Sequence, residues 1–136
     1  MHTVADLINP WFVLSLGAIA TAGLFFIIVL IEALVLRGLK WGSFRLSFVD
    51  SFVINLTSAT IGGLLFVLFA AAGALNLGVV PLFLLFGALT VLIEGAMLTV
   101  LKRHPLRQTW IAAVAINVAS YASLFVLVAV LKLSLA

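Results

Sequence analysis

The chain has no cysteine and very little charge. Without cysteine it can form no disulfide, offers no thiol nucleophile and supplies no thiolate to a metal. Only 8% of its 136 residues are charged, whereas 66% are hydrophobic. A soluble domain of this length could not cover its surface with so few charges. The two shortages together indicate an integral membrane protein without a soluble domain.

The sequence also lacks the motifs that most enzymes and cofactor proteins carry. Its two histidines, His2 and His104, lie outside the long apolar runs, so neither can ligate a haem or a pigment within them. No cluster of His, Asp and Glu has metal-ligand spacing, and there is no nucleophile–base pair or glycine-rich phosphate loop. We therefore expect no enzymatic activity, no metal and no bound cofactor.

Four apolar runs fill most of the sequence. A helix that crosses the hydrocarbon core of a bilayer needs roughly 20 apolar residues. These runs predict an all-α protein with four transmembrane helices in a single membrane domain. The expected spans cover about 11–36, 47–75, 81–101 and 110–131.

The start of the second span has the spacing of a capping box. Ser47 is followed three residues later by Asp50, and in such a pair the two residues satisfy each other's backbone N–H groups. The pattern predicts that this helix begins at Ser47. Asp50 can alternatively form an ion pair with Arg37 or Lys40 near the membrane interface.

The basic residues are confined to one side of the expected membrane domain. Six of the seven Lys and Arg residues flank the first and third linkers, and the second linker has none. By the positive-inside rule, linkers 37–46 and 102–109 face the cytoplasm and both termini face outward, in what we expect to be a prokaryotic plasma (inner) membrane. Nothing in this distribution indicates nucleic-acid binding. The six residues can also contact lipid head groups; they are Arg37, Lys40, Arg45, Lys102, Arg103 and Arg107.

A polar pattern occurs twice within this apolar sequence. Residues 29–61 match residues 91–123 at 11 of 33 positions. The pattern predicts two related helical hairpins, a first repeat over about 11–75 and a second over about 81–131. Because each hairpin returns the chain to the same side, the copies are parallel, and together they form an antiparallel four-helix bundle. The matched polar residues are Glu32, Asn55 and Ser58 in the first copy and Glu94, Asn117 and Ser120 in the second.

These polar residues are expected at a common depth. Glu32 and Glu94 each lie eight residues before a lysine, which is about 12 Å along a helix. Each Glu can reach an Asn in its own hairpin or in the other one, and Tyr121 is expected to join the network. Such contacts can be structural, worth roughly 0.6–2 kcal/mol each in a membrane, or they can mark a proton, cation or ligand site. Duplication favours the structural interpretation.

Small residues spaced four apart predict close helix packing or a docking face for another subunit. The second span has Gly62 and Gly63, each four residues after another small residue, and the fourth span has Ala115, Ala119 and Ser123.

The length and four-span layout resemble those of the small multidrug resistance transporters, which use a membrane-embedded glutamate in the first helix. The resemblance implies such a role for Glu32 alone. The second acid at Glu94 and the strong basic bias of two linkers depart from that family's pattern.

Three functions are compatible with these features. The favoured one is an accessory, structural or assembly subunit of a larger membrane protein complex, since the chain has short linkers and no soluble domain. The alternative is a small proton- or cation-coupled transporter or channel that uses Glu32 and Glu94; we expect it to be a homo-oligomer, because four helices enclose little space. A weaker alternative is the binding of lipid, quinone or pigment along apolar grooves.

Overall fold

The computed structural model describes residues 10–73, 78–101 and 103–134, and four long helices account for nearly all of them. The helices have 22 to 29 residues. At 1.5 Å per residue, each exceeds the roughly 30 Å hydrocarbon core of a bilayer. All four are long and apolar enough to cross a membrane, as the sequence predicts. They are α1 (Pro10–Gly38), α2 (Phe44–Ala71), α3 (Val79–Val100) and α4 (Leu106–Ser134).

The second helix begins earlier than the capping-box pattern predicts. Ser43, not Ser47, is the N-cap of α2, and its hydroxyl accepts the backbone N–H of Leu46 at 3.3 Å. Ser43 has the extended backbone that an N-cap requires, with φ −64° and ψ 158°. The prediction for Ser47 is therefore wrong: Ser47 lies inside the first turns of the helix and is buried.

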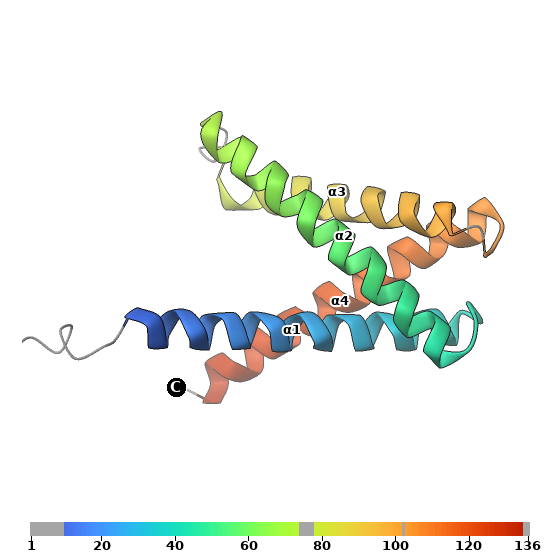
Figure 1. The fold of residues 1–136 in the computed structure, drawn as a ribbon, viewed down its shortest axis with the longest axis horizontal. Helices are drawn as coiled ribbons and strands as arrows, with labels where there is room; N and C mark the ends of the chain where they lie inside the picture. The colour runs from blue at the N-terminus through green and yellow to red at the C-terminus, as the bar shows by residue number, and fades with distance from the viewer. Residues whose placement is uncertain (1–9, 74–77, 102, 135–136) are drawn as a thin grey trace, which may run out of the picture.

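The helices form a closed ring of antiparallel neighbours (Figure 1). α1 packs against α2 and α4, and α3 packs against the same two helices. Within the described residues the backbones of the diagonal pairs α1–α3 and α2–α4 do not come close to each other. This is the expected four-helix bundle.

The two ends of the bundle differ in how tightly the helices pack. We call the end that carries linkers 39–43 and 101–105 the basic end, and the opposite end the far end. Every buried residue in the described part of the chain lies within 29–55 or 94–120, in the half nearer the basic end. Toward the far end, the α2–α3 pair stands clear of the α1–α4 pair (Figure 1). The bundle is therefore closed at one end and parted at the other.

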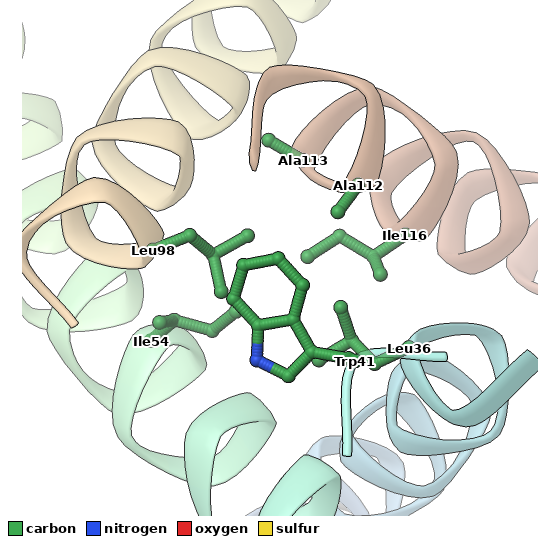
Figure 2. Packing of buried hydrophobic residues seen from close by; sticks show 7 residues of the cluster. All are labelled: Leu36, Trp41, Ile54, Leu98, Ala112, Ala113 and Ile116. Atoms are coloured by element: carbon green, nitrogen blue, oxygen red, sulfur yellow. The ribbon is translucent and has the colours of Figure 1, made fainter. Parts of the chain in front are cut away.

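A cluster of buried apolar side chains closes the basic end. Figure 2 shows the Trp41 indole at its centre, surrounded by Leu36, Ile54, Leu98 and Ile116 from the four helices, together with two alanines of α4. Trp41 is only 4% exposed although it belongs to a linker. Because lipid is as apolar as these side chains, their close packing contributes through van der Waals contact and not through exclusion of water alone.

Candidate functional site

Each of the two buried glutamates is paired with the asparagine that follows it by 23 residues. Asn55 Nδ2 donates to Glu32 Oε2, and Asn117 Nδ2 donates to Glu94 Oε2 at 2.6 Å. Glu32 and Glu94 are 2% and 1% exposed. Each pair therefore joins the two helices of one hairpin, α1 to α2 and α3 to α4.

Two serines connect the hairpins to each other. Ser120 Oγ donates to Glu32 Oε1 at 2.7 Å, and Ser58 Oγ donates to Glu94 Oε1 at 3.0 Å. Each serine lies three residues after an asparagine, so the two side chains share a helix face. The contacts form a closed circuit through all four helices. We call it the carboxyl ring; it consists of Glu32, Asn55, Ser58, Glu94, Asn117 and Ser120.

One further hydroxyl reaches only the first glutamate. Ser51 Oγ lies 3.3 Å from Glu32 Oε2 and 3.0 Å from the carbonyl oxygen of Val29. The residue 62 positions after Ser51 is Ala113, which has no side-chain donor. The match between positions 62 residues apart does not reveal Ser51, because the corresponding position holds no hydroxyl. Its position one helical turn before Asn55 is the signal that could have identified it.

The hydroxyl groups allow the ring to hold a carboxyl in either protonation state. Ser51 can donate to Glu32 or to Val29 O, and Ser58 can donate to Glu94 or, at 3.2 Å, to Asn55 O. A hydroxyl has one hydrogen and two acceptor lone pairs. A carboxylate accepts that hydrogen; a protonated carboxyl donates to the serine, which then turns its own hydrogen to the backbone carbonyl. Neither state requires a heavy atom to move.

The carboxyl ring forms part of the wall of a cavity of about 300 Å³. All six ring residues line it, and the other lining side chains, among them Phe25, Gly62 and Leu124, lie on the far-end side of the ring. On the basic-end side of the ring, a cluster of buried apolar side chains is packed together; this Trp41 cluster consists of Leu36, Trp41, Ile54, Leu98, Ala112, Ala113 and Ile116. The carboxyl groups are therefore approached from the far end and sealed toward the basic end.

Tyr121 lies at this cavity but outside the hydrogen-bonded ring. Its ring packs edge-on against Phe83 with centroids 5.5 Å apart, and it lines the cavity beside Asn117. In residues 10–73, 78–101 and 103–134, no hydrogen bond joins the Tyr121 hydroxyl to a ring residue. The structure thus brings six of the seven expected network residues together and leaves the seventh beside them.

The small residues expected to mark close helix contacts behave differently in the two helices. A Cβ atom built on Gly62 or Gly63 would meet no atom within 4 Å, because the far end of α2 is parted from α1. These glycines widen the cavity instead.

The small residues of α4 lie beside another groove. This groove of about 480 Å³ is almost wholly apolar, runs between α1 and α4 and includes Ser123. Ala115, Ala119 and Ser123 are half-buried.

The tightest backbone approach occurs at a glycine that the spacing pattern does not include. A Cβ atom on Gly95 would collide with the indole ring of Trp110. Gly95 follows Glu94 directly and is buried. Because Gly95 has no side chain, the Trp110 ring of α4 can lie directly against α3, next to the carboxyl ring.

A second polar cluster lies at the basic end. Asp50 is 2% exposed and accepts the indole N–H of Trp41 at 2.9 Å. Arg103 donates to both its oxygens, at 2.7 and 3.1 Å, and hydrogen bonding to Asp50 raises the pKa of the Arg103 guanidinium. The expected pairing of Asp50 with Arg37 or Lys40 is wrong. Arg37 instead donates to the carbonyl oxygen of Gly42.

The two basic linkers are also joined directly. His104 Nε2 lies 2.9 Å from the carbonyl oxygen of Trp41, and the two rings are 4.5 Å apart. Together with the Asp50–Arg103 pair, this contact holds the linker of one hairpin to the linker of the other. Among the other basic residues expected at this end, Lys40, Arg45 and Arg107 are exposed, and Lys102 lies outside the described residues.

The described residues contain no group of three or more His, Asp or Glu side chains arranged to hold a metal ion. No family model matches the chain, and no curated protein or solved structure shows significant similarity to it.

Proposed function

We propose that this chain is an integral membrane protein that binds protons or small cations at the carboxyl ring and moves them across the bilayer. The observation that supports this most is the shared cavity: both glutamates and both asparagines line one space of about 300 Å³ that extends toward the far end. Buried acids that face a cavity within a membrane typically belong to ion or proton pathways. Hydrogen bonds that serve packing alone need no such space beside them.

The closed basic end supports transport by alternating access. Passage to that end requires the Trp41 cluster to part. Its apolar side chains pack together, and few polar contacts hold it in addition: Asp50 with Trp41 and Arg103, and His104 with Trp41 O. The two helix pairs that already stand apart at the far end are the natural rigid bodies for such a movement.

Flux measurements with paired variants test the proposal. The purified chain in liposomes should carry a pH-dependent proton or cation flux that Glu32→Gln reduces at least tenfold and Glu94→Gln reduces by a smaller factor. Thr60→Val is the matched control, since Thr60 is exposed on α2 and bonds only to the carbonyl oxygen of Leu56 in its own helix. No flux from the wild type over a range of pH and alkali cations would remove the transport function.

We further propose that the basic end faces the cytoplasm of a prokaryotic plasma membrane, with both termini outside. The charge bias of linkers 37–46 and 102–109 supports this orientation. The absence of cysteine makes a direct test simple. A Cys introduced at the exposed Ala72, just after the end of α2, should react with an impermeant maleimide added outside intact cells, and one introduced at exposed Arg107 should not. The reverse result would invert the topology.

The chain is also proposed to be an internal duplication of one helical hairpin. The 62-residue offset relates Glu32, Asn55 and Ser58 to Glu94, Asn117 and Ser120, and the corresponding residues make corresponding hydrogen bonds. Residues that pack together also differ in a compensated way. The larger ring of Trp110 stands against a glycine, whereas the corresponding positions hold Phe48 and Ala33.

An accessory or assembly subunit of a larger membrane complex remains the second candidate. It is supported by the same ring, because each of the four helix contacts contains one of its hydrogen bonds, as a purely structural device would require. In this case Glu→Gln variants keep their function. A mild-detergent purification from native membranes decides between the candidates: stoichiometric larger membrane proteins support a subunit, and a lone chain or homo-oligomer supports transport.

A further inference from the structure

We infer that the carboxyl ring is an exchange site at which a monovalent alkali cation replaces the proton of Glu32. The inference rests on the proposed function, because it names the substrate class of the same site. Its starting point is the orientation of the two asparagine amides.

Both asparagines use all their hydrogens within the protein. Asn55 Nδ2 donates to the carbonyl oxygen of Ser51 at 2.9 Å and to Glu32. Asn117 Nδ2 donates to the carbonyl oxygen of Ala113 at 2.9 Å and to Glu94. An amide nitrogen carries two hydrogens, so these contacts fix each amide, with Oδ1 turned away from them. No hydrogen bond of the described residues ends on either Oδ1 atom.

These two oxygens are enclosed yet available to the cavity. Asn55 is 8% and Asn117 is 4% exposed, and both side chains line the cavity. Neither Oδ1 is a fully enclosed atom without a partner, which among the described residues is true only of Ser47 Oγ, so both oxygens face the cavity. An amide oxygen there can accept from a donor or bind a cation, and an apolar ligand supplies neither. The amide oxygens thus offer a cation two neutral ligands besides the acids themselves.

The rest of the polar wall is equally suited to a hard cation. Besides the ring, it has the hydroxyls of Thr90 and Tyr121, and no Lys, Arg or His of the described chain lines it. Carboxylate, carbonyl and hydroxyl oxygens are the ligands of alkali and alkaline-earth ions, whereas soft metals prefer sulfur and imidazole.

Charge balance favours a monovalent ion. Ionic charge in a low-dielectric site is stable only when it is compensated. Two carboxyl groups are neutral with two protons, with one proton and one monovalent cation, or with one divalent cation and no proton. The ligands disfavour the last state: Ca²⁺ takes six to eight oxygens and Mg²⁺ demands near-ideal octahedral geometry, and the described residues offer no group of three or more His, Cys, Asp or Glu side chains. Tyr121 on α4 is the other ionisable side chain at the cavity; α2 contributes none, since its Asp50 is held by Arg103 at the basic end.

The hydrogen bonds decide which glutamate gives up its proton. Three side chains can donate to Glu32 and two to Glu94, and donors stabilise the ionised form. In the exchange, the O–H bond of Glu32 breaks, its proton leaves through the cavity, and the cation takes the place of that positive charge beside the carboxylate. Glu94 keeps its proton and donates it to Ser58, whose own hydrogen turns to Asn55 O.

Cation-driven proton release from the full chain in detergent tests this exchange. Wild-type protein in weak buffer with a pH-indicator dye should release close to one proton per chain on addition of LiCl, NaCl or KCl. It should release none with N-methylglucamine chloride at equal ionic strength. Glu32→Gln should abolish the release. Glu94→Gln should retain it with a weaker apparent affinity, since Gln resembles the protonated acid, and Thr60→Val should match the wild type. Size-exclusion and thermal unfolding report whether each variant is folded.

The outcomes separate this inference from the proposed function. No release by any alkali chloride from folded wild type, at starting pH values from about 5 to 9, overturns the exchange; so does release by MgCl₂ or CaCl₂ alone. Full release from Glu32→Gln overturns the assignment to Glu32. If Glu32→Gln does not fold, the wild-type salt series still decides. Proton flux in liposomes without cation-driven release keeps the transport function and removes the exchange. Release in detergent without any liposome flux does the reverse.

Discussion

Glu32 and Glu94 occupy corresponding places in the two hairpins, yet their surroundings are not the same. Each accepts from an asparagine of its own hairpin and from a serine of the other. Glu32 has Ser51 as well, whereas the corresponding position beside Glu94 is Ala113. The shared contacts fix the four helices at one level. The contact that is not shared, from Ser51, favours the ionised form of Glu32 over that of Glu94.

The same asymmetry recurs one turn away at the basic end. Asp50 is in the first hairpin, and Ala112 stands at the corresponding place in the second. Trp41 and Arg103 lie 62 positions apart and both donate to this single carboxylate. Thus two of the polar groups without a counterpart in the second hairpin, Ser51 and Asp50, are neighbours on α2. Substitutions there and at the acids measure this part of the difference between the hairpins.

The largest expected effect is the unequal cost of removing the two acids. In Glu32→Leu, Ser120 loses its acceptor, Asn55 is left with only a long 3.4 Å contact to Ser51 Oγ in place of the carboxyl, and Ser51 can turn to Val29 O. In Glu94→Leu, only Asn117 is stranded, because Ser58 can turn to Asn55 O. At about 1 kcal/mol per stranded donor, Glu32→Leu should lose about 2 kcal/mol and Glu94→Leu about 1 kcal/mol. Unfolding in mixed micelles measures both.

The matched controls for this prediction are Glu32→Gln and Glu94→Gln, which keep an acceptor oxygen and should each lose less than the corresponding Leu variant. Equal losses from the two Leu variants would show that the alternative carbonyl acceptors of Ser51 and Ser58 do not compensate in the way the distances imply.

A second comparison is steric and concerns the glycine beside Glu94. Gly95→Ala places a methyl group against the Trp110 indole, and overpacking of this kind costs about 1–2 kcal/mol. The first hairpin has Ala33 and the smaller Phe48 at the corresponding positions. Trp110→Phe should therefore restore most of the lost stability when combined with Gly95→Ala. Thermal unfolding of the two single variants and the double variant measures the coupling free energy between positions 95 and 110. Strictly additive losses of stability would contradict the predicted rescue by Trp110→Phe.

Much of the fold and part of the site can be predicted from the sequence. Runs of apolar residues of sufficient length determine the four helices, and the Glu, Asn and Ser residues that recur 62 positions apart identify the side chains that meet in the carboxyl ring. Their spacing from the basic linkers is enough to place them at one depth. What a repeat cannot supply is the rotation of each helix, so the choice between own-hairpin and cross-hairpin contacts follows only from the structure.

Other features depend on groups that no local pattern connects. The Asp50–Arg103 pair joins residues 53 positions apart, and its charges could equally have met nearer basic residues. Spacing at Gly62 and Gly63 permits close approach of another backbone but does not supply one, and α2 is parted from α1 there. Ser51 was missed because repeat matching selects what is duplicated, and this hydroxyl is not.

A smaller effect is expected from loosening the contacts at the basic end. Asp50→Asn removes the ionic partner of Arg103, whose side chain is 34% exposed; allowing for solvent screening, the loss is about 1 kcal/mol. Opening of the Trp41 cluster should then become about fivefold more frequent. The rate at which a small thiol reagent modifies Leu98→Cys, a fully buried position in the cluster, measures this opening with and without Asp50→Asn. An unchanged rate would show that the apolar contacts alone keep this end closed.

The smallest expected effect exchanges the roles of the two acids. Ser51→Ala combined with Ala113→Ser moves the unshared hydroxyl from Glu32 to Glu94, at about 0.5–1 kcal/mol, or a twofold to fivefold change in apparent cation affinity. In this background Glu94→Gln should abolish cation-driven proton release and Glu32→Gln should only weaken it, the inverse of the wild-type order. Ser47→Ala is the matched control, because Ser47 Oγ is buried on the same helix without a hydrogen-bond partner in the described chain. If the order of the two Gln variants does not change, Ser51 is not what distinguishes the glutamates.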